Sequence, residues 1–205
     1  MFCSTFAACL NREVIVEENE YLHRLIDQVD CLYQWVVVDP RNEETFLQAE
    51  RMLRHKKCVG IKLHPQYHNY SLEEYADKIF SFAASFKAIV LIHPERDLSK
   101  MIPIVNRYPD VTFIIAHLGS AGHVDVVAAA KYNNVYVDTS GGASTANLII
   151  EYAHNRIGAD RILFGTDTYA AGFQRGRIEF ALIPKEDKRK VLFENAAKLF
   201  AKHLE

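Results

Sequence analysis

The chain has 205 residues, of which 49% are apolar and 24% charged, and its formal net charge is −2. This composition is typical of a single globular domain with a sizeable core. The near-neutral charge argues against nucleic-acid binding, and no apolar run approaches the roughly 20 residues that span a bilayer.

The N-terminal segment MFCSTFAACL is apolar but lacks a basic start and continues directly into NREVIVEENE. We therefore expect a strand here and not a signal peptide. The first third of the chain holds all the cysteines, without a C-x-x-C pair: Cys3, Cys9, Cys31 and Cys58. Their mostly apolar, strand-like surroundings favour buried reduced thiols, and we expect a cytoplasmic protein.

Short apolar runs alternate with longer amphipathic segments along the rest of the chain. Several runs are continuous in Val, Ile, Leu and Phe, which is typical of parallel strands covered on both faces. Strands are expected at MFCSTFA (1–7), LYQWVVVD (32–39), CVGIKLH (58–64), AIVLIH (88–93), VTFIIAH (111–117), VYVDTS (135–140) and RILFGTD (161–167). Helices are expected at 42–56, 71–86 and 97–108, the second beginning with a capping box from Ser71 to Glu74.

Repeated βα units fit either an open doubly wound sheet or a closed barrel. The chain has no G-x-G-x-x-G turn, which would favour a dinucleotide-binding open sheet. A barrel instead carries functional side chains at the C-terminal ends of several strands. The sequence shows that arrangement, so we expect one α/β barrel domain over residues 1–205.

Titratable side chains close five of the expected strands. Residues two apart on a strand share a face, so Lys62 is expected to point with His64, His93 with Glu95, and Asp138 with Ser140. His117 and Asp167 close two further strands.

Two imidazoles and a carboxylate, from His93, His117 and Asp167, suit a divalent metal such as Zn²⁺. Such a metal lowers the pKa of its bound water to about 7, and Asp167 could accept that water's proton. Each residue also has a simpler explanation: a hydrogen-bonded core histidine, or an aspartate in a turn or helix cap. Asp138, before TSGG, is expected to be a turn former. The combined pattern favours a shared metal site.

The segments GIKLHP, VLIHPE, FIIAHLGS, VYVDTSGG, ILFGTDTY and LFENAAKLF resemble, in order, the signatures of the amidohydrolase-related family. These proteins are metal-dependent TIM-barrel hydrolases and decarboxylases. The resemblance implies that His93 is a metal ligand, that His117 binds metal or polarises the substrate, and that Asp167 binds metal and shuttles protons. It also places Lys62 near a lysine that bridges two metals in some relatives.

One feature of the family is missing. Its first strand carries an H-x-H pair of metal ligands, and this chain has no H-x-H; its first histidine, His23, lies in a helical pattern. We therefore expect an incomplete TIM barrel of seven parallel strands, from a shortened version of a longer parent. The open strand edges favour a homo-oligomer. His64 and His68 could supply substitute ligands.

The resemblance implies a metal-dependent hydrolase that uses activated water against an amide, ester or lactone of a small organic molecule. We assign the metal to His93, His117 and Asp167, with Zn²⁺ or Mn²⁺ as cofactor, and Lys62 and His64 to substrate binding. Three alternatives stay open: a non-oxidative decarboxylase with the same site, a catalytically impaired scaffold, and a Schiff-base aldolase using Lys62.

Overall fold

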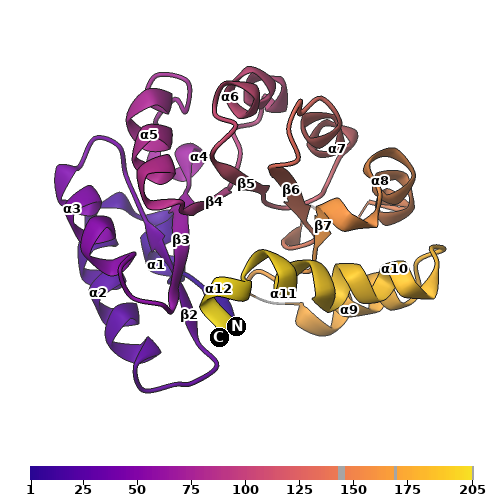
Figure 1. The fold of residues 1–205 in the computed structure, drawn as a ribbon, viewed down its shortest axis with the longest axis horizontal. Coiled ribbons are helices and arrows are strands. Elements are labelled where there is room, and N and C mark those ends of the chain that lie inside the picture. Colours follow the sequence, from indigo (N-terminus) through magenta and orange to yellow (C-terminus); the bar gives the residue numbers. More distant parts are fainter. Residues whose placement is uncertain (143–145, 169, 205) are drawn as a thin grey trace. The chain divides into compact units, whose positions relative to one another are not determined.

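The computed structural model describes residues 1–142, 146–168 and 170–204 (Figure 1). The chain divides into two compact units, which are described separately. Unit 1 comprises Met1–Asp97 and Tyr108–Phe113, and unit 2 comprises Leu98–Arg107 and Ile114–Glu205.

Unit 1 is built from short parallel strands, each followed by helical structure. Its elements are β1 (Phe2–Cys3), α1 (Phe6–Leu10), η1 (Arg12–Val14), α2 (Ile15–Ile26), β2 (Tyr33–Val37), α3 (Glu43–Met52), β3 (Cys58–Leu63), α4 (Pro65–His68), α5 (Ala76–Phe86) and β4 (Ile89–Ile92). The pairings β1–β2, β2–β3 and β3–β4 are all parallel. Strand β5 (Thr112–Ile115) begins in unit 1 and ends in unit 2.

Helix α2 is joined to strand β2 by a buried asparagine. The Asn19 amide donates to the Val37 carbonyl at 2.9 Å, and its Oδ1 accepts from the Val37 N–H at 3.0 Å. The same amide donates to Gln48 Oε1 on α3 at 2.8 Å. One side chain thus satisfies backbone groups of β2 and ties two helices to that strand.

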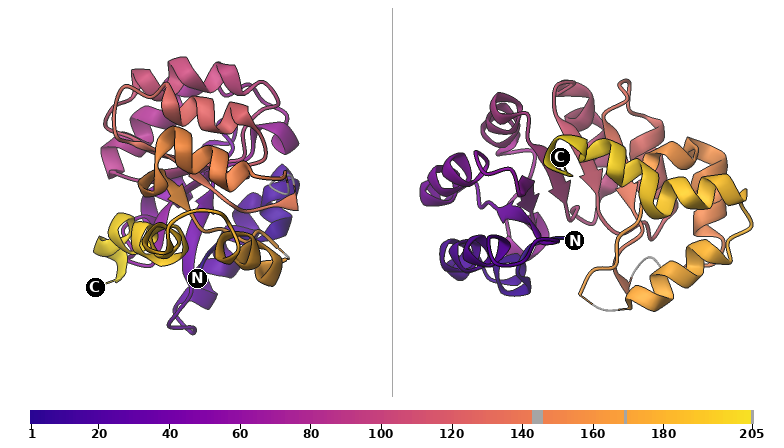
Figure 2. Two further views of the ribbon diagram at one scale, coloured as in Figure 1. Left: turned by 90° about the vertical axis from the view of Figure 1, so that its right-hand side faces the viewer. Right: turned by 60° about the horizontal axis from the view of Figure 1, so that its bottom comes forward.

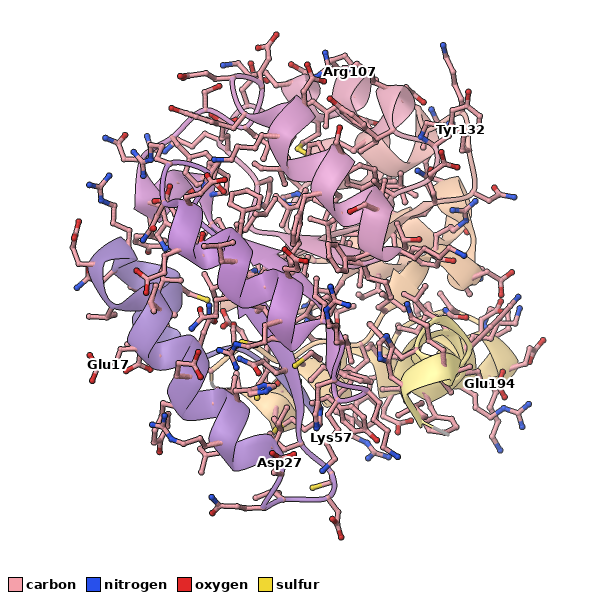
Figure 3. All side chains as sticks on the ribbon, turned by 60° about the vertical axis from the view of Figure 1, so that its left-hand side comes forward. Glu17, Asp27, Lys57, Arg107, Tyr132 and Glu194 are labelled. Carbon is pink, nitrogen blue, oxygen red and sulfur yellow. The ribbon has the colours of Figure 1, made fainter. Side chains whose placement is uncertain are left out.

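Charged side chains lie at both ends of α2, with the acidic Asp27 and the basic Lys57 together at its C-terminal end (Figure 3). Glu17 lies in the first turn, and the Lys57 ammonium donates to the Ile26 carbonyl at 2.6 Å, just before the C-cap residue Asp27. An acidic start and a basic end both stabilise a helix.

Strands β3 and β4 approach each other closely at Gly60. A Cβ at this position would lie 2.0 Å from the Ile89 carbonyl oxygen. Only glycine therefore fits this point of the sheet.

Unit 2 contains the remaining elements (Figures 1 and 2). They are η2 (Leu98–Lys100), α6 (Met101–Arg107), α7 (Ala121–Ala128), β6 (Val135–Asp138), α8 (Ile149–Ile157), η4 (Ala159–Arg161), β7 (Ile162–Leu163), α9 (Ala171–Glu179), α10 (Lys185–Arg189), the π-helical turn η5 (Lys190–Glu194), α11 (Asn195–Leu199) and α12 (Ala201–Leu204). Strands β6 and β7 pair in parallel, with Asp138 opposite Leu163.

The C-terminal helices are attached to β7 by one asparagine. Asn195 donates to the carbonyls of Ala159 and Ile162, at 2.8 and 2.9 Å. This contact gives the asparagine of the LFENAAKLF signature a structural role.

The strand order β1-β2-β3-β4-β5-β6-β7 follows chain order. The expected α/β fold with seven parallel strands is confirmed; a closed (β/α)₈ barrel has eight. Within the described residues, no helix has the length and apolar character needed to cross a membrane.

Two local predictions in unit 1 are wrong. The expected strand over residues 1–7 is only β1, because the Thr5 hydroxyl accepts from the Ala8 N–H and starts helix α1. The capping box from Ser71 to Glu74 does not form. Helix α5 begins later, after the N-cap residue Tyr75, without a side-chain cap.

Candidate functional site

Unit 1 contains three of the predicted site residues, Lys62, His64 and His93, near the ends of β3 and β4, and the two histidines are in contact. Lys62 and His64 are both buried, as are all residues of β3. The His64 and His93 rings stack with centroids 4.0 Å apart and 19° between their planes. The backbone N–H of His93 donates to the Leu63 carbonyl at 3.0 Å. The ring Nε2 of His93 lies 3.3 Å from Gln66 Oε1.

His68, predicted as a possible substitute metal ligand, instead makes a hydrogen bond between two helices. Its Nε2 donates to the Ala8 carbonyl at 2.9 Å, and burial lowers the pKa of the imidazole. This histidine therefore joins α4 to α1.

An ion pair between a buried carboxylate and a partly exposed guanidinium, not predicted from the sequence, follows strand β2. The Arg41 guanidinium donates to both Asp39 carboxylate oxygens, at 3.0 and 2.7 Å. Burial acts to raise the pKa of Asp39, but the hydrogen bonds and charge of Arg41 outweigh it and lower that pKa. Arg41 also lines a pocket of about 340 Å³ with Asn69, Tyr70, Ser71, Glu74, Tyr75 and Glu95.

Unit 2 contains a buried polar chain at the ends of β5 and β6. The Ser140 hydroxyl lies 2.8 Å from His117 Nδ1 and donates to Asp138 Oδ1 at 2.5 Å. Asp138 and Ser140 are 9% and 6% exposed. The shared face predicted for Asp138 and Ser140 is therefore confirmed, and it faces His117.

Asp138 also holds the backbone around His117. Its Oδ1 accepts from the His117 N–H at 3.1 Å, and its carbonyl accepts from the Leu118 N–H at 2.8 Å. His117 has φ +69°, a left-handed conformation that costs an ordinary residue about 1–2 kcal/mol. These two hydrogen bonds offset that cost. Asp138 Oδ1 also accepts from the Ser140 N–H at 2.8 Å, which is the turn expected from the DTSG sequence.

Two glycines provide the space for this polar chain. A Cβ on Gly141, whose φ is +80°, would lie 2.4 Å from His117 Nδ1. A Cβ on Gly165 would lie 2.9 Å from Ser140 Cβ and 3.2 Å from Asp138 Cγ. Both glycines are therefore required by the side chains that they face.

His123, on α7, is a neutral neighbour of this group. Burial, with a smaller effect of His117, lowers the pKa of His123 to about 4. Its Nδ1 lies 3.0 Å from the Ser120 hydroxyl.

Asp167 lies beyond β7 in a left-handed conformation, with φ +61°. Its side chain is exposed, and its Oδ1 accepts from the Thr168 N–H at 2.9 Å. The strand expected over residues 161–167 is therefore wrong in length: it is only β7, which ends at Leu163, and Asp167 lies in the segment that follows.

The donor chemistry of His117 fits a metal ligand. A serine hydroxyl can donate one hydrogen bond, and the Ser140 hydroxyl donates to Asp138 Oδ1. In its contact with His117 Nδ1 the hydroxyl therefore accepts, which requires the ring proton to be on Nδ1. The lone pair is then on Nε2, the arrangement in which a histidine binds a metal. No group of three His, Cys, Asp or Glu side chains that could hold a metal ion occurs among the described residues. The convergence of His93 with His117 and Asp167 therefore stays a prediction.

Parallel strands with histidines just beyond the ends of β3, β4 and β5, and with Asp138 at the end of β6, define this chain as an α/β protein of the barrel class with its candidate groups at strand ends. A family model described as amidohydrolase matches residues 4–202, and the chain belongs to that family. The resemblance seen in the sequence is confirmed. No curated protein sequence matches the chain.

Solved structures share this fold. 2,6-Dihydroxybenzoate decarboxylase from Rhizobium has a TM-score of 0.74 at 16% identity, over 98% of this chain and 83% of the other. 5-Carboxyvanillate decarboxylase from Sphingomonas paucimobilis has a TM-score of 0.71 at 15% identity, over 92% and 72%. A probable 2-pyrone-4,6-dicarboxylic acid hydrolase from Acinetobacter baumannii has a TM-score of 0.68 at 17% identity, over 89% and 78%. At these identities the likeness shows the fold.

Proposed function

We propose that this chain is a metal-dependent enzyme that removes CO₂ from a small aromatic or unsaturated acid. His93, His117 and Asp167 would hold a divalent metal, Mn²⁺ or Zn²⁺. The observation that carries the proposal is the polar chain from Asp138 through Ser140 to His117, because it leaves His117 Nε2 with the lone pair that a metal needs. A dihydroxybenzoate decarboxylase of the same fold, from Polaromonas, was crystallised with bound manganese, which supports a divalent metal here.

The substrate class is supported by charge at the strand ends. Lys62 is 7% exposed and lies in β3, two residues before His64, and a lysine ammonium suits a substrate carboxylate. A bound metal would supply positive charge that stabilises an anionic substrate. Asp167 would relay the proton that replaces the departing CO₂ on carbon.

Hydrolysis is the second candidate, because the pyrone-dicarboxylate hydrolase shares the fold. In that reaction Asp167 would accept a proton from the attacking water and return it to the leaving group. Both reactions concern small molecules, and we place the enzyme in the cytoplasm, which the four free thiols support. A homo-oligomer stays part of the proposal, because β1 and β7 are the terminal strands of the sheet order.

Metal content per chain tests the site. The protein purified without chelator should carry about one equivalent of Mn²⁺ or Zn²⁺, and Asp167→Ala should lose it. Asp160→Ala removes another aspartate of unit 2, with a side chain that is 76% exposed, and should keep the metal. Absence of metal from the unmodified protein would overturn the proposal.

Product analysis separates the two reactions. Dihydroxybenzoates and carboxyvanillate labelled with ¹³C in the carboxyl group should release labelled CO₂ if the enzyme is a decarboxylase. Incorporation of ¹⁸O from water into the product of a lactone would instead identify a hydrolase. Trapping of substrate on Lys62 by borohydride would contradict both and support the Schiff-base alternative.

A further inference from the structure

The imidazole of His117 has two tautomers, and the surrounding residues determine which of them forms. Three groups share two mobile protons here: the His117 ring, the Ser140 hydroxyl and the Asp138 carboxylate. The 2.5 Å contact assigns the hydroxyl proton to Asp138 Oδ1, since an ionised carboxylate only accepts. The 2.8 Å contact then requires a proton on His117 Nδ1.

We propose that Asp138 and Ser140 are positioning residues that hold His117 in the Nδ1–H tautomer and so prepare Nε2 as an electron-pair donor. The inference rests on the proposed function for its catalytic consequence, but the tautomer itself does not require a metal. Neither residue would touch the substrate. Asp138 would act on His117 only through Ser140 and through the backbone.

A purely structural turn would not require this arrangement. The turn at 138–140 needs the Asp138 carboxylate and the Ser140 N–H, which lie 2.8 Å apart. The Ser140 hydroxyl is buried and contacts the imidazole as well as the carboxylate, and its contact with the imidazole is not needed to close the turn. Its position is explained by a role toward His117.

The surrounding residues keep the imidazole in place. Gly141 leaves room for the His117 ring, which a Cβ would meet at 2.4 Å. The Gly141 carbonyl accepts from the buried Gln174 amide at 2.8 Å, and Arg177 donates to Gln174 Oε1 at 2.7 Å. Helix α9 thus anchors the glycine against which His117 packs.

The tautomer can be measured directly. Long-range ¹H–¹⁵N NMR spectra of histidine-labelled protein, without added metal and at about pH 8, where an ordinary imidazole is neutral, distinguish a protonated from an unprotonated ring nitrogen. His117→Asn assigns the signals. We expect His117 to show a protonated Nδ1 and an unprotonated Nε2.

Three variants test the cause. Ser140→Ala should shift His117 toward the Nε2–H tautomer, and Ser140→Thr, which keeps a hydroxyl, should restore the original pattern. Ser120→Ala removes a hydroxyl beside His123 Nδ1 and should leave the His117 signals unchanged. An unchanged His117 pattern in Ser140→Ala, or an Nε2–H tautomer in the unmodified protein, would overturn the inference.

Mn²⁺ titration links the tautomer to the metal. Ser140→Ala and Asp138→Asn should each weaken Mn²⁺ binding by about 10–100-fold, as loss of an orienting partner does at other metal sites. Unaltered Mn²⁺ affinity in both variants would refute the positioning role. If the unmodified protein shows the Nδ1–H tautomer but binds no Mn²⁺, the proposed function fails and the tautomer assignment stands.

Discussion

Replacement of Gly165 by alanine tests how closely the turn after β7 packs against Asp138 and Ser140. The new Cβ would lie 2.9 Å from Ser140 Cβ and 3.2 Å from Asp138 Cγ. Carbon atoms in favourable contact lie about 3.5–4.0 Å apart, so Asp138 Cγ would have to move by roughly 0.3 Å and Ser140 Cβ by roughly 0.6 Å at the least. Both neighbours are buried and held by hydrogen bonds, so the strain cannot be relieved by a simple rotation.

Overpacking of this kind costs about 1–3 kcal/mol. For a chain of this length, 1 kcal/mol corresponds to about 2–4 °C in Tm. We therefore expect Gly165→Ala to lower Tm by about 2–12 °C and to disturb the His117 tautomer signals. Thermal unfolding followed by circular dichroism measures the first effect.

Gly176 provides a matched control for the same chemical change. It lies inside α9, and a Cβ there would meet nothing within 4 Å. Gly176→Ala should stabilise the helix by about 0.5–1 kcal/mol, because alanine loses less backbone entropy than glycine. If Gly165→Ala and Gly176→Ala both raised Tm, the close packing inferred around Gly165 would be wrong.

Two further predictions concern stability. Asn19→Leu leaves the N–H and carbonyl of Val37 buried without their side-chain partner, so unfolding free energy should fall by about 2–6 kcal/mol in urea titrations; a loss below 1 kcal/mol would contradict this. The lowered pKa of His123, about 4, means that the unfolded chain binds the proton more readily, so stability should decrease as pH falls from about 6.5 to about 4. Across this pH range the His123→Gln variant should lose about 2–3 kcal/mol less unfolding free energy than the unmodified protein. Equal losses in the two proteins would refute the lowered pKa of His123.

The strands could be predicted because buried parallel strands are continuous apolar runs. Cys58–Leu63 and Ile89–Ile92 lie within the expected segments for this reason. The strand predicted over residues 1–7 is wrong because an apolar run without clear periodicity suits a strand and a helix equally. The Thr5 cap starts a helix within this run. Ser71 likewise matched a capping box by spacing, but the chain from 72 to 75 forms a turn, so that spacing was not sufficient.

The candidate site was only partly predictable, because sequence shows which residue types end the strands but not which of them meet. His117 was identified as a functional histidine, whereas the role of Ser140 depends on a contact across 23 residues. Two glycines in the sequence nonetheless indicate this contact between His117 and Ser140. Gly141 follows the D-x-S sequence and Gly165 precedes Asp167 by two residues, and each is required by the polar chain that it faces.

These two glycines connect the predicted and the unpredicted parts of the site. In a parallel sheet, Asp138 pairs with Leu163, so the chain after β7 runs beside the chain after β6. Gly165 therefore reaches Ser140 by register alone, and any side chain there would push on the partner of His117. The D-x-S-G and F-G-x-D segments form one unit, in which a substitution in either segment acts on the same imidazole. A variant that alters Gly165 should consequently resemble a Ser140 variant in its His117 tautomer signals, although Gly165 has no polar side chain of its own.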